Sequence, residues 1–472
     1  MCEQTIGRAQ CFREATAMLE DNKKEAAGTH VPVTDGTQFI VMKAWEEVLQ
    51  VNRYLGITDN FFELGGDQSK ADRIAGRIKN ISLTAQDILE NPTIEKLAQI
   101  LWERISYIEK GDMPAAMREN LDAEYYFCRN GSFDEFTQLL DCNSLMYYFY
   151  LKRYVKDYAK HVGILLQDIS VNVSLNPDGS LCDIWCGDFD AADEVFKAEV
   201  VNRKGYESMA DIERLLEQGK IVVIRTYTKK LPFHKDFISL DFEITDSQEE
   251  IERNNHTFIA VAHDGEMLYY IEIPAVLTDR FIPYGKNKSV GVIKKTDLKP
   301  AFDVDLIFAS VGIDAERLSR GIDMRDLLRK IISNYFKPSY YNNGFKVFCG
   351  FEALEMLKQI FESEALYLDH KHLYYKYMNV KGLLEWKLWS VLARRMLLKA
   401  ILEQYRDIYP EFSRQNLNDV LTELVEEWKR FRMKVIYRYF KGDFIAGKAY
   451  LKYINKIIAM ERNIVEKLEE VL

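Results

Sequence analysis

The chain has 472 residues, of which 47% are hydrophobic and 29% are charged. This length exceeds the size at which one hydrophobic core stops growing, so two or three domains are expected and a single small module is excluded. The composition is that of a folded chain, not of a disordered one. With 63 basic and 73 acidic residues, the formal net charge is −10, which provides no general attraction to nucleic acid or to an anionic membrane.

The sequence also predicts a compartment and a redox state. It contains no apolar run of about 18 residues and does not begin with a basic segment followed by an apolar stretch, so we expect a cytoplasmic protein. The seven cysteines are spread thinly along the chain. We therefore expect reduced thiols and no disulfide framework.

The N-terminal part of the chain is predicted to be a helical bundle between two irregular segments. Residues 1–36 are polar and are expected to form a flexible leader. Between residues 37 and 108, short runs with helical spacing flank one long glycine-containing loop, which predicts a small helical bundle. Residues 109–122 contain glycine and proline and are interpreted as a linker.

The remaining chain is predicted to be mixed at first and then helical. Residues 123–345 combine helical stretches with runs of β-branched residues, which predicts an α+β domain. Within it, residues 257–262 and 267–273 are separated by a short turn and are expected to form an antiparallel hairpin. Residues 346–472 have almost wholly helical spacing, which predicts an all-α domain.

The loop of the predicted bundle contains a recognisable motif. Residues 57–67 read ITDNFFELGGD, and residues 88–98 read ILENPTIEKLA. Over about residues 38–108 the chain resembles the peptidyl and acyl carrier proteins, whose signature is D-x-F-F-x-L-G-G-[DH]-S. The resemblance implies a four-helix carrier bundle that holds 4′-phosphopantetheine on the serine as a phosphodiester. A helix N-terminus suits such an anion, because it offers free N–H groups and a positive dipole end.

The sequence departs from this family at the serine itself. Gln68 follows Asp67, and Ser69 comes one residue later. Glutamine cannot be phosphopantetheinylated, and a shift of one residue turns a side chain by about 100° around a helix. Either a phosphopantetheinyl transferase modifies Ser69, for instance because the helix starts one residue later, or the domain is degenerate and an acyl-loaded carrier comes from another protein. Ser69 could also be an ordinary helix N-cap.

A cysteine, a histidine and a carboxylate form the second group of candidates. Cys142 directly precedes an aromatic-rich run of helical spacing at 145–158, where the helix dipole would lower the pKa of its thiol. The alternative is a small buried hydrophobic residue. His256 begins the first strand of the predicted hairpin and Glu272 lies on the second strand, so pairing would bring the two side chains together. The three residues would then form a papain-like catalytic triad.

The order of these segments adds a second resemblance. After the cysteine helix come LLEQGKIVVIR at 215–225, LPFH at 231–234, the strand that His256 begins and a strand with an acid, isoleucine and proline. This order resembles the cysteine-protease-like acyltransferases of natural-product assembly, the family of the butirosin-biosynthesis acyltransferase and the amide-forming enzyme of closthioamide assembly. The resemblance covers about residues 123–345. It implies a papain-like fold that passes an acyl group from a carrier thioester through Cys142 to an amine.

The resemblance also raises alternatives for the catalytic residues. The family usually has an aspartate just before the proline, whereas Glu272 lies two residues ahead of it, so Asp279 remains an alternative third member. Gln138, upstream of the cysteine, is a candidate donor to an oxyanion. His263 could exchange roles with His256, although its place near the hairpin turn favours a surface role.

A metal site is not expected. Cys182 and Cys186 lie four residues apart, and His370 and His372 lie two apart, but this spacing does not complete a four-ligand zinc set.

Three functions stay open from the sequence. The first is a carrier-dependent acyltransferase that forms an amide bond in nonribosomal natural-product biosynthesis, with an acyl-loaded carrier and an amine acceptor as partners. The second is a thioesterase or peptidase that releases the product to water. The third is a non-catalytic scaffold that docks other assembly proteins.

Overall fold

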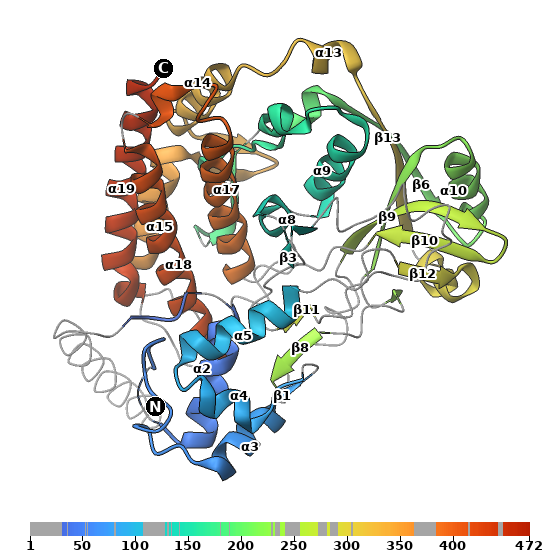
Figure 1. Cartoon of the computed structure of the whole chain (residues 1–472). Coiled ribbons are helices and arrows are strands. Elements are labelled where there is room, and N and C mark those ends of the chain that lie inside the picture. Colours follow the sequence, from blue (N-terminus) through green and yellow to red (C-terminus); the bar gives the residue numbers. More distant parts are fainter. Residues whose placement is uncertain are drawn as a thin grey trace.

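The structure, a computed structural model, has a helical N-terminal region, antiparallel sheets in the middle of the chain and a helical C-terminal region (Figure 1). At this level it confirms the predicted multidomain architecture. The structure describes residues 31–34, 36–51, 53, 55–79, 82–106, 128–129, 132–133, 135–140, 142–179, 181–187, 189–227, 230–231, 237–240, 255–271, 281–283, 291–303, 305–362, 384–413, 416–441 and 447–472.

The N-terminal region is a bundle of short helices. Its helices are α2 (Gly36–Leu49), α3 (Gln68–Arg77), α4 (Ala85–Glu90) and α5 (Ile94–Ser106). Apolar residues at helical spacing meet in one core, and the rings of Trp45 in α2 and Phe61 in the long loop lie 5.4 Å apart at its centre. Both side chains are fully buried, so the aromatic residue of the loop motif anchors that loop to the bundle.

Helix α4 is held at its start by a carboxylate that also binds α5. The side chain of Asp87 accepts hydrogen bonds from the backbone N–H and hydroxyl of Thr84, at 2.8 and 2.7 Å, and forms a capping box. Arg104 of α5 donates to the same carboxylate at 2.7 Å. This hydrogen bond from Arg104 is the main reason why the pKa of Asp87 falls from 3.8 to about 2.

An Asp87→Asn substitution is therefore expected to destabilise the bundle in a pH-dependent way. The folded-state pKa of Asp87 is depressed, so its stabilisation is present above pH 4 and is lost as the pH falls toward 2. Because the Asp87–Arg104 ion pair is partly exposed, we expect the substitution to lower the free energy of unfolding by about 0.5–1 kcal/mol at neutral pH. Hydrogen exchange of the α4 and α5 amides in the full chain measures it. A difference between wild type and variant that persists unchanged at pH 2 would contradict this assignment.

The bundle is joined to the rest of the molecule through a small sheet and one helix. Strand β1 (Ile78–Lys79), directly after α3, pairs antiparallel with β8 (Phe237–Leu240), which pairs in turn with β11 (Phe281–Pro283). From α18 (Leu417–Lys441), Met433 is buried within the core of the bundle. Contacts far apart in the sequence therefore fix the bundle to the remainder of the chain.

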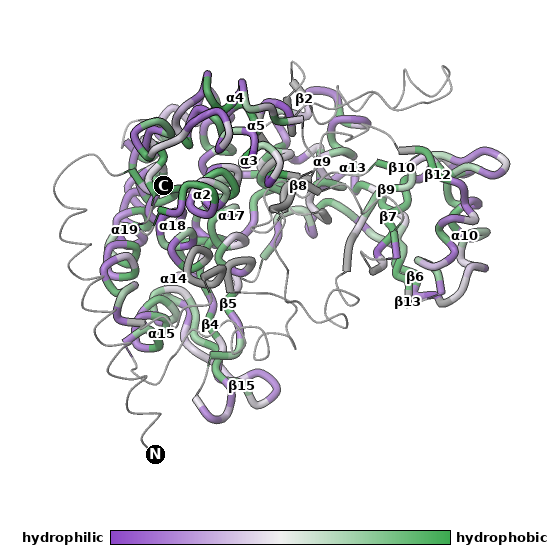
Figure 2. Tube along the Cα trace, turned by 90° about the horizontal axis from the view of Figure 1, so that it is seen from below, coloured by the Kyte–Doolittle hydropathy of each residue, from purple (hydrophilic) through white to green (hydrophobic). Residues whose placement is uncertain are grey.

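The central region contains a six-stranded antiparallel sheet of order β12-β10-β9-β7-β13-β6. The strands are β6 (Phe196–Lys204), β7 (Ile221–Tyr227), β9 (Asn255–Asp264), β10 (Met267–Ile271), β12 (Gly291–Lys294) and β13 (Asp305–Ile313). Strands β9 and β10 form the predicted antiparallel hairpin, with a bulge between Tyr269 and Tyr270. In Figure 2 the strands β7 and β9 are largely green, because their side chains supply apolar contacts to both faces.

The two faces of this sheet pack against different helices. On one face, α9 (Cys142–Tyr154) lies against β9, and residues such as Val223 and Ile259 join its core. On the other face, α10 (Ser208–Glu217) and α12 (Lys299–Phe302) cover a second core that contains Ile224 and Phe258. Alternate residues of each strand therefore serve opposite faces, as a strand period of two requires.

A second sheet connects the central and C-terminal regions. It has the order β14-β15-β4-β5, with β4 (Val171–Leu175), β5 (Leu181–Cys186), β14 (Tyr340–Asn342) and β15 (Phe345–Cys349). Strand β15 lies where the sequence predicted the all-α region to begin, and it pairs with β4 from the central part of the chain. The sheet thus links the two regions by backbone hydrogen bonds.

The C-terminal region packs long helices around a buried core. These helices are α14 (Met324–Tyr335), α15 (Gly350–Glu362), α17 (Leu384–Gln404), α18 and α19 (Leu451–Glu470). Two short helices of this region are η6 (Pro410–Ser413) and η7 (Gly447–Tyr450). Short elements in the preceding part of the chain are β2 (Cys128–Arg129), β3 (Ser132–Phe133), α8 (Glu135–Leu139), η1 (Tyr158–Leu165), η2 (Ala191–Glu194), η4 (Lys295–Leu298) and α13 (Ala315–Ser319). Within the described part of the chain, the helices are too short or too polar to cross a bilayer.

Candidate functional site

The loop and helix that carry the ITDNFFELGGD motif form a tight turn. Gly65 has a φ of +81°, a conformation that glycine adopts without strain. A Cβ at Gly66 would lie 2.5 Å from the Phe61 ring and its carbonyl oxygen, so a larger residue would collide there. The Lys70 ammonium donates to the Gly65 carbonyl at 2.6 Å and ties α3 back to the loop. The motif glycines thus allow the loop to close onto the bundle.

Helix α3 begins at Gln68, not at Ser69. Asp67 is the N-cap, and its carboxylate accepts a hydrogen bond from the Lys70 backbone N–H at 2.8 Å. The expectation that Ser69 is the N-cap is therefore wrong, and so is a helix start one residue later. Gln68 and Ser69 are both exposed, in the first turn of the helix.

Known proteins match this same N-terminal part of the chain. Residues 40–101 match a family described as "Phosphopantetheine attachment site". Residues 40–101 are a carrier domain. Tyrocidine synthase 1 from Brevibacillus parabrevis is 38% identical over 82 residues, which are 17% of this chain and 7% of that protein.

Two further synthases show the same pattern of similarity. A plipastatin synthase from Bacillus subtilis is 34% identical over 85 residues, 18% of this chain and 3% of its own length. Chondramide synthase from Chondromyces crocatus is 33% identical over 90 residues, 19% of this chain and 2% of its own length. The chain thus spans less than a tenth of these relatives. The carrier domain is homologous to those of nonribosomal peptide synthetases, which carry 4′-phosphopantetheine.

The attachment position of this particular carrier domain does not fit the cofactor. In the family signature the serine directly follows Gly-Gly-Asp, and that position is Gln68, whose amide cannot form a phosphodiester. The nearest hydroxyl, that of Ser69, is exposed but lies one residue further along α3, about 100° around the helix.

Treatment of the full chain with a phosphopantetheinyl transferase and coenzyme A should therefore leave its mass unchanged. A Gln68→Ser variant restores a hydroxyl at the first residue of α3 and should gain one phosphopantetheine arm, visible by intact-protein mass spectrometry. A Ser69→Ala variant serves as the matched control. If the wild type gains an arm that Ser69→Ala abolishes, the attachment site is Ser69 and this expectation is wrong.

The candidate nucleophile lies at the start of α9. Cys142 is the first residue of that helix, which begins three residues earlier than the helical run expected from residue 145; the side chain of Cys142 is outside the described part of the structure. Ser144, two residues on, is buried in the same first turn. The side chain of Gln138, in α8, is also outside the described part.

The candidate histidine, His256, is the second residue of β9 and pairs with Thr226 of β7. Its side chain is outside the described part of the structure, and so are Glu272 and Asp279. The proposed contacts within the triad therefore remain predictions.

A cavity joins the two backbone segments that carry the candidates. It has a volume of about 340 Å³ and lies between α9 and the central sheet. Its lining includes Ser144, Gln167, Asp190, Arg225, Thr257 and Arg394. Ser144 follows Cys142 by two residues, and Thr257 follows His256 by one, so the start of α9 and the start of β9 border one space.

The register of β9 constrains the role of His256. Arg225 and Thr257 line the cavity on the α9 side of the sheet. Thr226 instead donates its hydroxyl to the Ala301 carbonyl of α12, at 2.7 Å, on the opposite side. Because His256 pairs with Thr226, a regular strand places position 256 on the α12 side. A catalytic contact with Cys142 requires β9 to leave regular alternation at its first residues.

The second histidine of β9 is engaged elsewhere. His263 lies beside the hairpin turn, its Nδ1 is 3.2 Å from the Lys295 ammonium, and its Nε2 is 3.7 Å from a Glu217 carboxylate oxygen. It pairs with Leu268 at the far end of the strand. His263 therefore lies at the turn end of the hairpin, as its place in the sequence predicted, with 15% of its side chain exposed.

Cys182 and Cys186 were considered as metal ligands from their spacing in the sequence. Among the described residues, no three His, Cys, Asp or Glu side chains are grouped as metal ligands. Cys186 is buried beside Arg395, and burial raises the pKa of its thiol. Cys182 is partly exposed, and His370 and His372 lie outside the described residues.

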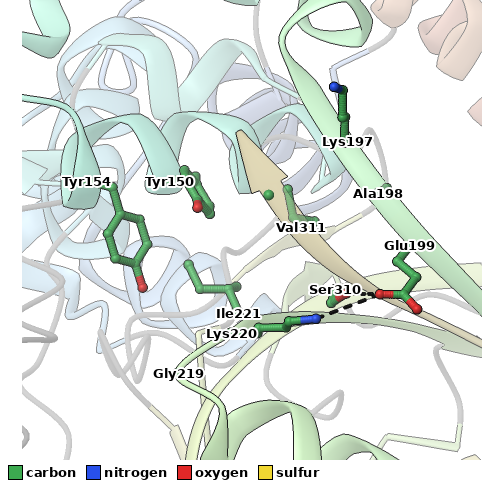
Figure 3. Close-up of a pocket in the computed structure, with 11 residues that line it drawn as sticks. Tyr150, Tyr154, Lys197, Ala198, Glu199, Gly219, Lys220, Ile221, Ser310 and Val311 are labelled. Atoms are coloured by element: carbon green, nitrogen blue, oxygen red, sulfur yellow. Dashed lines mark hydrogen bonds and ion pairs between the residues drawn. The ribbon is translucent and has the colours of Figure 1, made fainter. Parts of the chain in front are cut away.

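A second, larger cavity of about 620 Å³ lies further along α9 (Figure 3). The rings of Tyr150 and Tyr154 are 4.6 Å apart and form one wall. Across the cavity, Glu199 is 3.7 Å from the Lys220 ammonium and accepts a hydrogen bond from Ser310 at 3.5 Å. The described residues of its lining combine these two tyrosine rings with charged and small side chains, and include neither a cysteine nor a histidine.

Proposed function

We propose that the chain is a cytoplasmic acyltransferase that takes an acyl group from a carrier-protein thioester and transfers it to an amine in nonribosomal natural-product biosynthesis. The observation that carries the proposal is the cavity bordered by the first turn of α9, where Cys142 lies, and by the start of β9, where His256 lies. A cysteine at a helix N-terminus beside an antiparallel sheet is the arrangement that a papain-like acyl transfer needs.

In the first half of the reaction Cys142 accepts the acyl group. His256 removes the thiol proton, and the Cys142 sulfur attacks the carbonyl carbon of the donor thioester. The bond between that carbon and the donor sulfur breaks, and the departing thiol takes the proton from His256. N–H groups at the start of α9 favour the thiolate before the attack.

In the second half the acyl group moves to the acceptor. The amine attacks the carbonyl carbon of the acyl-enzyme, its proton passes to His256, and the bond to the Cys142 sulfur breaks. An amide is released, and the Cys142 thiolate is regenerated. Glu272, or Asp279 in its place, holds the imidazole in the orientation for both transfers.

The donor thioester is supplied by a carrier on a partner protein. Gln68 replaces the attachment serine, so the carrier domain of this chain lacks the hydroxyl at the family position. On a partner carrier, the arm and its acyl group are substrates of the reaction. The N-terminal domain then serves to dock other assembly proteins.

Intact-protein mass spectrometry of the full chain tests the proposal. Incubation with an acyl-loaded partner carrier and no amine should add one acyl group, which peptide mapping places on Cys142. A mass that stays unchanged with a panel of acyl-carriers contradicts the proposal. Addition of an amine should then release an amide. If the adduct forms but decays to free acid at the same rate with and without amines, water is the acceptor and the enzyme is a thioesterase.

A second candidate function is a non-catalytic scaffold. It is favoured by Gln68 and by the register that places position 256 on the α12 side of the sheet. In that case the chain binds carrier proteins but forms no acyl-enzyme, and Cys142→Ala leaves the output of the assembly system unchanged.

A further inference from the structure

The cavity at the start of α9 contains balanced charge. Arg225 of β7 and Arg394 of α17 contribute two guanidinium groups to its lining, and Asp190 and Asp193 contribute two carboxylates. The formal charges of these four side chains cancel. A pocket with this lining is matched in charge to a ligand that carries one cation and one anion.

The carboxylate wall is held in place by a buried chain of hydrogen bonds. The amide of Gln167 donates to the Ser144 hydroxyl at 2.8 Å and to the Asp190 carboxylate at 3.1 Å. The other oxygen of Asp190 accepts from the Ala192 backbone N–H at 3.0 Å and caps η2. Gln167 and Ser144 are 7% and 3% exposed, so water competes little for these bonds. Asp190 is therefore preorganised relative to the first turn of α9.

The guanidinium groups lie on different elements. Arg394 is half-buried, and its Nη1 donates to the backbone carbonyls of Asp168 and Cys186, each at 3.1 Å. These two bonds fix its guanidinium beside the cavity. Arg225 is exposed and faces the cavity from the sheet. Asp193, in η2, is also exposed. The lining thus includes one cation and one anion held by hydrogen bonds, Arg394 and Asp190, and one exposed cation and one exposed anion, Arg225 and Asp193.

We propose that this cavity is the acceptor site and that the acceptor is a small zwitterion, an amine that also carries a carboxylate. The proposal rests on the acyl transfer proposed above. Asp190 and Asp193 bind the ammonium group, and Arg225 and Arg394 bind the carboxylate. The volume of about 340 Å³ suits a ligand of amino-acid size. Before the attack the bound ammonium gives one proton to water beside the Asp190 carboxylate and becomes the free amine. As the amine nitrogen then attacks the acyl carbon, a second proton passes to His256, the bond between that carbon and the Cys142 sulfur breaks, and the carboxylate of the acceptor remains on the arginines.

Calorimetric titration of the full chain with matched small molecules tests the charge assignment. L-Norvaline and 5-aminopentanoate carry both charges at different separations, butylamine carries only the cation, and pentanoate only the anion. At least one zwitterion should bind about tenfold or more tightly than either singly charged compound. Equal affinity for all four compounds, or for pentanoate and the zwitterions, overturns the proposal. The second of these outcomes identifies a site for anions only.

Two exposed residues allow the charges to be removed one at a time. Asp193→Asn should weaken the binding of the zwitterion and of butylamine several-fold and leave the binding of pentanoate unchanged. Arg225→Gln should weaken the binding of the zwitterion and of pentanoate several-fold and leave the binding of butylamine unchanged. Arg203→Gln and Asp211→Asn, an ion pair outside the cavity lining, are the matched controls. Cavity variants that behave like these controls overturn the proposal.

The two proposals can fail separately. Acylation of Cys142 by a loaded carrier is measured without any acceptor, whereas zwitterion binding is measured without any donor. If Cys142 is acylated but the zwitterion neither binds nor captures the acyl group faster than butylamine, only the acceptor assignment is wrong. If the zwitterion binds with the expected charge dependence but no acyl-enzyme forms, the acyl transfer is wrong and the cavity remains a zwitterion site.

Discussion

A Cys142→Ala variant is expected to form no acyl-enzyme and to lose amide-forming activity by about 10³-fold or more. The physical reason is that alanine provides no sulfur to accept the acyl group, so the two-step route is lost and only binding and orientation remain. The measurement is single-turnover transfer from an acyl-loaded carrier to an amine, with intact-mass detection of the adduct. Product formation by Cys142→Ala at the wild-type rate would exclude covalent catalysis at this position.

The matched control is Cys182→Ala, which removes a partly exposed thiol from β5 and should leave the rate unchanged. His256→Ala addresses the register of β9 separately. If position 256 serves the reaction, this variant loses most of the activity and its dependence on pH near neutrality. If it lies on the α12 side, the variant acylates Cys142 normally. Glu272→Gln and Asp279→Asn then decide which carboxylate acts as the third member.

A Glu461→Gln variant is expected to destabilise the helical region by about 3–5 kcal/mol. Glu461 of α19 is fully buried and accepts from the Arg395 guanidinium at 2.6 Å, the Trp428 indole at 2.8 Å and the Tyr335 hydroxyl at 2.5 Å. Burial alone would lower the pKa of Arg395, but the carboxylate of Glu461 raises it overall, so the guanidinium stays charged. Loss of the negative charge therefore leaves a buried cation without compensation.

Denaturant unfolding followed by tryptophan fluorescence, to which the buried Trp428 contributes, measures the loss of unfolding free energy. Glu466→Gln changes an exposed carboxylate on the same helix and should shift the unfolding free energy by less than about 0.5 kcal/mol. A double variant, Glu461→Leu with Arg395→Met, removes both charges and should recover much of the stability. A Glu461→Gln variant within about 1 kcal/mol of wild type would show that the network does not hold α17, α18 and α19 together.

The sequence predicted features that depend on neighbouring residues. The carrier motif, the aromatic-rich helix next to Cys142 and the hairpin of β9 and β10 all follow from local spacing, and the structure contains them, with the helix starting at Cys142 and not at residue 145. The alternative in which Ser69 caps α3 was wrong, although Asp67 is a strong N-capping residue and was the available signal. Here the family pattern drew attention to Ser69 and away from the local capping rule.

Features that depend on distant partners were not predictable in the same way. Which face of the sheet position 256 occupies depends on its pairing with Thr226 and on the contact of Thr226 with α12. A shift of one residue reverses the face, and no local pattern in β9 excludes such a shift. The cavity lining likewise combines side chains from α9, β7, η2 and α17, whose approach is set by tertiary packing.

The pairing of β1 with β8 has a mechanical consequence for the candidate site. Strand β1 directly follows α3 of the carrier domain, and the other two strands of its sheet, β8 and β11, precede β9 and follow β10 in the sequence. Displacing the carrier domain would break that pairing and expose Met433 to water. A partner that displaces the bundle therefore also displaces β8, which precedes His256 in the sequence, and β11, which follows Glu272. A force on the N-terminal domain would thereby reach the proposed acyl-transfer centre through the backbone.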